Sequence, residues 1–272
     1  GSEVYTYNLS KELSKRHEVI VFYRVANPQK EEYATEWGEY DGLRVFTINN
    51  TFRECLSFEL IYKNDIIAEK FGTFLDEVRP DVVHFGHVTC LSTSCIAEAR
   101  KREIPVVYTL HDFWLICQRG QFLKRDLSIC HRQEDRECVK CLAYQMMVTE
   151  GRKRTSRILG GAHGDLLKRT LLWRYVLKMA SVFYSNSKFL REEKAIKEIQ
   201  KRTEYIKEMM EKVNIFIAPS HFMKEKYIEF GIPEKKIVYS DYGFDASLFR
   251  EIIRRPSEKV CFGYIGTWIL IS

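Results

Sequence analysis

The sequence predicts an α/β fold built on a doubly wound parallel β-sheet, and three observations support this prediction. Short segments rich in β-branched and aromatic residues alternate with segments whose apolar residues recur at helical spacing. The composition, 45% hydrophobic and 29% charged over 272 residues, is that of a globular chain long enough for one large domain or two modest ones. The apolar segments are short and nearly uninterrupted, as in parallel strands that helices cover on both faces.

The expected elements follow one another along the chain as strand and helix. The segment 57–80 carries apolar residues at helical spacing until Pro80 stops it, and further helices are expected at 92–103 and 221–231. Between about 142 and 213 the pattern becomes long, helical and charge-rich, unlike a compact strand–helix unit. The expected strands are 17–24, 43–49, 81–87, 105–111, 214–220 and 236–243.

The stretch YTLHDFWLICQRG, residues 108–120, places polar and aromatic side chains where a predicted strand ends. His111 and Asp112 lie at that end, and in open parallel sheets ligands bind in the crevice beyond the carboxyl ends of the strands. His84 and His87, from the preceding strand, face the same crevice if the two strands are parallel. Each histidine could instead bond to the backbone where its strand closes, and Asp112 could cap the following turn.

Charge and hydropathy exclude several classes of protein. No run approaches the roughly 18 uncharged apolar residues of a membrane span, and the N-terminal residues lack the basic-then-apolar pattern of a signal peptide. We therefore expect a cytoplasmic protein. The formal charge of +6, from 43 Lys+Arg against 37 Asp+Glu, is a mild excess that suits phosphates or an anionic membrane face. Because basic residues are interleaved with acidic ones and no nucleic-acid motif is recognised, we expect no nucleic-acid partner.

Several stretches together resemble one enzyme family. RPDVVHFGH, VVYTLHDFWLIC, IFIAPSHFMKEKYIEFGIPEKKIVYSDYGFDASLF and the closing FGYIGT are similar, in order and spacing, to the N-terminal half of family-4 glycosyltransferases. That family has the two-domain GT-B fold, so the resemblance implies a Rossmann-like N-terminal domain over residues 1–255, with a helical and Cys-rich insertion at about 112–213. Residues 256–272 would be a linker and the first strand of a truncated C-terminal domain.

The resemblance implies transfer of a sugar from a nucleotide-activated donor to a hydroxyl acceptor, usually with retention at the anomeric carbon. In this family the N-terminal domain holds the acceptor, here a saccharide or a lipid-linked sugar, and the C-terminal domain grips the nucleotide-sugar. The chain would therefore hold mainly the acceptor side and be inactive alone. Backbone N–H groups, helix N-termini and basic side chains would stabilise the leaving diphosphate, so no cofactor is expected for catalysis.

The resemblance also assigns candidate site residues. His111 matches the family's histidine at the end of the fourth strand, close to the transferred sugar, and Asp112 beside it would bind an acceptor hydroxyl or cap the turn. Gly1 and Glu3 match the last glycine of the family's Gly-rich loop and its acidic residue, under the donor phosphates. Trp114 would stack on a sugar or anchor the loop. The expected catalytic residues are thus His111 and Asp112, and the expected substrate-binding residues are Gly1, Glu3, His84, His87 and Trp114.

Four of the eight cysteines crowd one irregular segment: Cys117, Cys130, Cys138 and Cys141, the last two as CVKC. A C-x2-C pair can place two thiolates on one Zn²⁺, and two further cysteines complete a tetrahedral set. A structural zinc would order a loop that has few apolar residues. The alternatives are reduced thiols without a metal, a disulfide, or His131 in place of one cysteine.

Residues 165–184 place leucines on one side among Lys and Arg residues, as in a helix that lies on an anionic membrane, although a core-facing helix has the same pattern. Peripheral contact with the inner face of the membrane is therefore one expectation. The sequence leaves two other functions open. One is a non-catalytic, zinc-containing protein that binds nucleic acid or a partner through the Cys cluster and GRKRTSR (151–157). The other is a sugar-nucleotide epimerase of the same GT-B fold.

Overall fold

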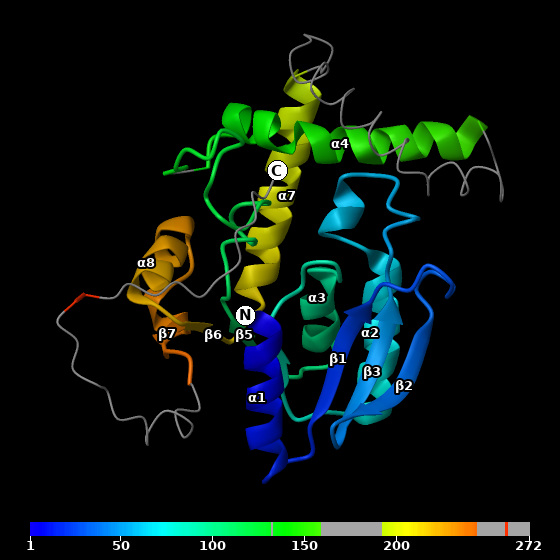
Figure 1. The fold of residues 1–272 in the computed structure, drawn as a ribbon, viewed down its shortest axis with the longest axis vertical. Coiled ribbons are helices and arrows are strands. Elements are labelled where there is room, and N and C mark those ends of the chain that lie inside the picture. Colours follow the sequence, from blue (N-terminus) through cyan, green and yellow to red (C-terminus); the bar gives the residue numbers. More distant parts are fainter. Residues whose placement is uncertain (132, 159–191, 244–258, 261–272) are drawn as a thin grey trace.

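The parallel sheet predicted from the sequence is present in the computed structural model, which describes residues 1–131, 133–158, 192–243 and 259–260. All of its neighbouring strands pair in parallel. This confirms the α/β, Rossmann-like fold class (Figure 1). The strands, in their hydrogen-bonded order, are β4 (Val83–Phe85), β5 (Val106–Thr109), β6 (Ile215–Ala218) and β7 (Ile237–Tyr239).

A second sheet of three strands has the order β1-β3-β2. The expected strands at 17–24 and 43–49 are observed as β1 (Ile20–Val25) and β3 (Leu43–Asn49), which pair in parallel. A strand that was not expected, β2 (Thr35–Tyr40), pairs antiparallel with β3 through Asp41 and Gly42, whose φ angles are 48° and 73°. An Asp-Gly pair is a hairpin signal, but the polar residues of β2 conceal the strand. Among the described residues the two sheets do not hydrogen-bond to each other.

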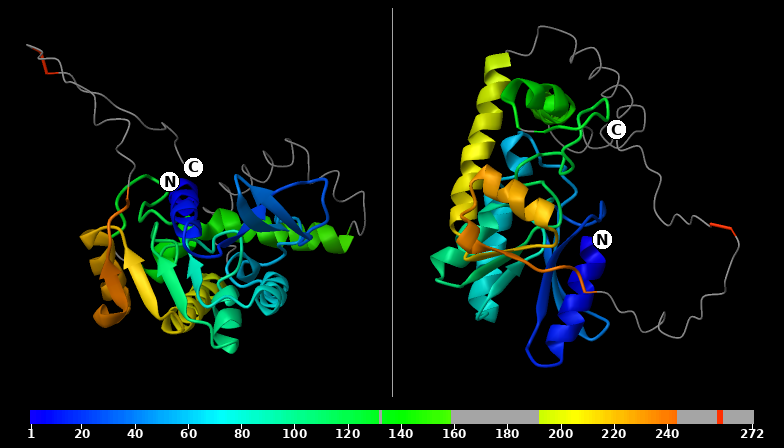
Figure 2. Two further views of the ribbon diagram at one scale, coloured as in Figure 1. Left: turned by 90° about the horizontal axis from the view of Figure 1, so that it is seen from below. Right: turned by 90° about the vertical axis from the view of Figure 1, so that its left-hand side faces the viewer.

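Helices lie on both sides of the sheets, as a doubly wound fold requires. Figure 2 shows α1 (Ser2–Ser14) on one side, and α2 (Asp65–Val78), α3 (Ser94–Lys101) and α7 (Glu192–Glu211) on the other. α8 (His221–Phe230) packs beside β6 and β7, and α4 (Asp135–Ile158) packs across α7. Two short 3-10 helices complete the described elements, at Glu59–Ile61 and Glu234–Lys236.

An aromatic core joins the two sheets through α2. The rings of Phe46 on β3 and Phe74 on α2 are stacked with centroids 4.9 Å apart. One turn earlier on α2, Phe71 lies 5.8 Å from Phe85 on β4. Because Phe46, Phe71, Phe74 and Phe85 are all buried, this cluster holds both sheets against one helix.

Some expected helices differ from the observed ones in extent. The segment expected as a helix at 57–80 makes a 3-10 turn first, and α2 begins only after Asn64, whose side chain accepts from the Ile67 N–H group at 3.1 Å. α7 confirms the described part of the helix expected at 187–213. The membrane-like helix expected at 165–184 lies outside the described residues, as does all of 256–272 except 259–260. In the described part of the chain, no helix is long and apolar enough to cross a membrane.

The Asn64 side chain holds the start of α2 through two contacts. It caps the helix, and its Nδ2 group donates to the Tyr33 hydroxyl at 3.2 Å in the core. We expect Asn64→Ala to lower the free energy of unfolding by about 2 kcal/mol, since a cap is lost and a buried hydroxyl loses its partner. Asn64→Ser keeps an acceptor for the cap and should lose clearly less. Urea unfolding measures both variants, and wild-type stability of Asn64→Ala would contradict this role.

Candidate functional site

Parallel pairing of β4 with β5 brings the predicted polar residues to one edge of the sheet. Val83 pairs with Val106, and His84 pairs with Val107, so both strands reach their carboxyl ends together. His87 follows β4 by two residues, and His111 and Asp112 follow β5 by two and three. The structure therefore brings side chains that are distant in the sequence to one edge of the sheet, at the carboxyl ends of its strands.

His87 and Asp112 form a hydrogen-bonded pair across the two strand ends. The Nε2 atom of His87 lies 3.0 Å from Oδ2 of Asp112. On the other side of the ring, Nδ1 accepts from the backbone N–H group of Thr89 at 2.9 Å. Since a backbone N–H can only donate, a neutral His87 carries its hydrogen on Nε2 and donates it to the carboxylate. This pair orients one oxygen of Asp112, whose side chain is 41% exposed.

The turn after β5 fixes the other oxygen of Asp112. Oδ1 accepts from the Trp114 N–H group at 2.8 Å, which makes a local Asp turn. Gly120, with φ of 76°, comes so close that a Cβ atom there would lie 3.0 Å from Oδ2 of Asp112. The Phe113 N–H group donates to the Gly120 carbonyl at 3.0 Å and closes the loop. Asp112 thus caps a turn, which is one of the two roles that the sequence left open, and it also presents a partly exposed carboxylate.

His111 is enclosed by two tyrosines from distant parts of the chain. Its Nδ1 atom lies 2.7 Å from the Tyr242 hydroxyl, and the two rings stack with centroids 5.5 Å apart. Tyr5 of α1 packs edge-on against the imidazole at 4.9 Å. Burial, with a smaller contribution from His87, lowers the pKa of His111 to about 4. The imidazole is therefore neutral at pH 7.

The second ring nitrogen of His111, Nε2, lies in a buried position. Nε2 is buried and has no hydrogen-bond partner among the described residues. Gly86 at the end of β4 leaves space beside it, since a Cβ atom at that position would lie 3.7 Å from Nε2 and 3.2 Å from the Thr6 hydroxyl of α1. A buried imidazole nitrogen without a partner in a strand-end site suits a ligand hydroxyl.

Tyr5 and Tyr242 were not expected at the site. Tyr242 lies in the stretch 236–243, at the carboxyl end of a predicted strand, which is the same signal that identified His111. Tyr5 lies on the first helix, one turn after Gly1. The sequence does not reveal that either ring contacts His111, because Tyr242 is 131 positions away.

The other predicted residues are placed less centrally. His84 is exposed, with Nε2 2.7 Å from the Thr109 hydroxyl. Gly1 is the N-cap residue of α1, and the exposed Glu3 carboxylate lies 3.6 Å from the terminal amino group of Gly1. Trp114 is only 4% exposed and lies beneath His87, with ring centroids 6.2 Å apart. In this structure its ring anchors the loop, which is one of the two roles expected for it.

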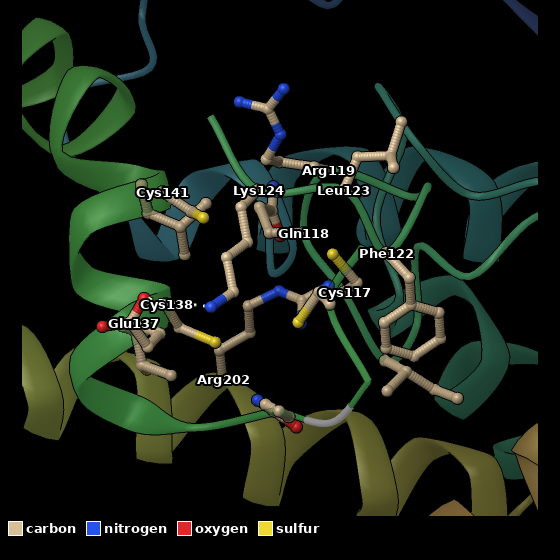
Figure 3. A pocket seen from close by; sticks show the side chains of 15 residues that line it. Cys117, Gln118, Arg119, Phe122, Leu123, Lys124, Glu137, Cys138, Cys141 and Arg202 are labelled. Atoms are coloured by element: carbon tan, nitrogen blue, oxygen red, sulfur yellow. Dashed lines mark hydrogen bonds and ion pairs between the residues drawn. The ribbon is translucent and has the colours of Figure 1, made fainter. Parts of the chain in front are cut away.

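The four clustered cysteines line one small cavity of about 30 Å³ between the loop after β5, α4 and α7 (Figure 3). Burial raises the pKa of Cys138 to about 12 and also raises that of Cys141. The sulfur atoms border the cavity without converging on a point. Among the described residues, no group of three or more His, Cys, Asp or Glu side chains has the spacing that holds a metal ion.

Comparison with known proteins identifies a family. The model of Glycosyltransferase Family 4 matches residues 1–248. No curated protein and no solved structure matches the chain. The family match spans both strand ends that form the site and agrees with the parallel sheet. The chain therefore belongs to glycosyltransferase family 4.

Proposed function

We propose that this chain provides the acceptor side of a retaining glycosyltransferase, which moves a sugar from a nucleotide-activated donor to a hydroxyl of a saccharide or lipid-linked acceptor. Membership of the family supports a glycosyltransferase function in general. The finer assignment is supported by the strand-end site, where a neutral imidazole and an oriented carboxylate lie beside each other on consecutive residues.

The buried Nε2 atom of His111 is the single observation that carries the proposal. Its Nδ1 atom is engaged by Tyr242, so Nε2 is left as one directed donor or acceptor, according to the tautomer that the tyrosine hydroxyl selects. A neutral ring can hydrogen-bond a sugar hydroxyl without bringing a second positive charge to the site. Its pKa of about 4 keeps it neutral through the physiological range.

Asp112 is the proposed contact for the acceptor. Its carboxylate is partly exposed, and His87 and the Trp114 N–H group each hold one of its oxygens. An oriented carboxylate accepts a hydrogen bond from an acceptor hydroxyl and directs the hydroxyl oxygen toward the anomeric carbon. In the transfer, that oxygen forms the new bond to carbon as the bond to the diphosphate oxygen breaks. The bonding electrons leave with the diphosphate, and the hydroxyl proton passes to the departing phosphate oxygen.

The first test is His111→Ala in the enzyme that also carries the nucleotide-binding domain, assayed for transfer of labelled sugar from a panel of nucleotide-sugars to saccharide and lipid-linked acceptors. We expect turnover to fall more than tenfold with a nearly unchanged melting temperature, because a contact to the transferred sugar is lost and the strand remains paired. His17→Ala, which removes an exposed histidine after α1, is the matched control and should keep full activity.

Two results of that assay would count against the proposal. Wild-type turnover in His111→Ala would make the histidine structural only. Conversion of a nucleotide-sugar to its epimer, with no label in any acceptor, would favour an epimerase of the same fold instead.

A second test uses the pH dependence of stability. Burial holds the pKa of His111 at about 4 in the folded chain, against about 6.5 when unfolded. Between these values the unfolded state binds a proton that the folded state does not, so stability should fall as the pH drops from about 6.5 to about 4. Since the side chain is partly exposed, we discount the full shift and expect a loss on the order of 2 kcal/mol.

The comparison for this test is His111→Gln, which cannot titrate. Its unfolding free energy, measured in urea from pH 4 to pH 7, should depend on pH less steeply than that of the wild-type protein. Parallel profiles for the two proteins would mean that His111 is not kept neutral by burial.

A further inference from the structure

A buried arginine in α7 has no negative partner among the residues that the structure describes. Arg202 is 2% exposed, and its guanidinium carries a positive charge at pH 7. Its Nη2 group donates to the Trp114 carbonyl at 2.5 Å, and the guanidinium lies over the rings of Trp114 and Tyr62 at 5.1 and 5.9 Å. Its Nε atom is buried with no hydrogen-bond partner among the described residues. No carboxylate is among the groups that bond to it in that part of the chain.

This arrangement is costly unless an anion is bound close by. A buried cation that is paired only with a carbonyl and ring faces loses several kcal/mol of hydration free energy. Glu137 is the carboxylate that lines the same cavity, but it is engaged by Lys124 at 3.4 Å and Lys140 at 2.6 Å. The groups that act electrostatically on Arg202 from within the cavity are Cys117 and Cys138.

The cysteines approach the cavity from two independent elements. Cys117 and Cys130 lie on the loop after β5, and Cys138 and Cys141 lie three positions apart on α4, so they share one face of that helix. Figure 3 shows Arg202 extending from α7 into the space between α4 and the loop that carries Cys117. A guanidinium with an unused N–H group therefore reaches into a cavity bordered by four thiol groups.

We propose that Cys117, Cys130, Cys138 and Cys141 bind one Zn²⁺ as thiolates, and that Arg202 donates to these sulfur atoms and offsets their charge. Four thiols release their protons to solvent and four Zn–S bonds form, which gives a centre of net charge −2 beside a cation of +1. Because no group of described side chains already has the spacing that holds a metal ion, zinc binding requires the four side chains to reorient until each sulfur lies about 2.3 Å from the metal.

The direct test is metal analysis of the protein purified without chelator, followed by titration of the metal-free protein with Zn²⁺ and with Co²⁺. We expect about one zinc per chain and a cobalt spectrum with sulfur-to-metal charge-transfer bands. Cys117→Ser and Cys138→Ser should each lower zinc affinity at least tenfold. Cys90→Ser removes a thiol outside the cavity and should bind zinc like the wild-type protein. Absence of zinc uptake, bound iron instead of zinc, or a disulfide among the four cysteines would overturn the proposal.

The role of Arg202 has a separate test in Arg202→Met, with Lys201→Met, a 68% exposed neighbour on α7, as the matched control. Arg202→Met should bind zinc at least tenfold more weakly, since the thiolate charge loses its counter-ion. In the metal-free state the same variant should melt at a higher temperature than the wild-type protein, because an uncompensated buried charge is gone. Wild-type zinc affinity in Arg202→Met, or a lower melting temperature of its metal-free form, would contradict this role.

Discussion

The arrangement of both sites depends on the parallel pairing of β5 between β4 and β6. This register sets His87 beside Asp112 and sends the chain out of the sheet after Thr109, and the next described strand of the sheet begins at Ile215. The described part of the chain between β5 and β6 contains the loop with Cys117 and Cys130, then α4 and α7. A shift of β5 by one residue would turn His111 to the opposite face of the sheet and separate it from Tyr5 and Tyr242.

Two buried side chains, one on α7 and one on α8, hydrogen-bond to the backbone just after β5. The Tyr227 hydroxyl of α8 donates to the Asp112 carbonyl at 2.8 Å, and Arg202 of α7 donates to the Trp114 carbonyl. Both carbonyls lie just beyond the strand, where no ladder bond would satisfy them. The backbone that carries Asp112 is therefore anchored by helices that come later in the chain, and two residues after Trp114 it reaches the cavity at Ile116. A change in the cavity can reach the proposed acceptor contact through this short segment.

The sequence was sufficient for features with a local signal and insufficient for features made by long-range contact. The strands of the parallel sheet are apolar runs, and His111 and Asp112 could be placed at its edge because strand ends are readable. The strand β2 was missed since its residues are mostly polar and only Asp41 and Gly42 marked the hairpin. Arg202 belongs to a segment of alternating charge that predicts a solvated helix, and local periodicity does not reveal that this one arginine faces the core.

Burial has opposite consequences for the two basic groups at these sites. An imidazole loses its proton when it is desolvated, so His111 becomes neutral and needs no counter-ion. A guanidinium cannot do the same at pH 7 because its unperturbed pKa is too high, so Arg202 stays charged. The proposed acceptor site thereby presents an uncharged ring, whereas the buried guanidinium at the proposed zinc site calls for an anion. Thiolates satisfy that requirement only if something keeps them deprotonated in a buried place, and a metal ion does so.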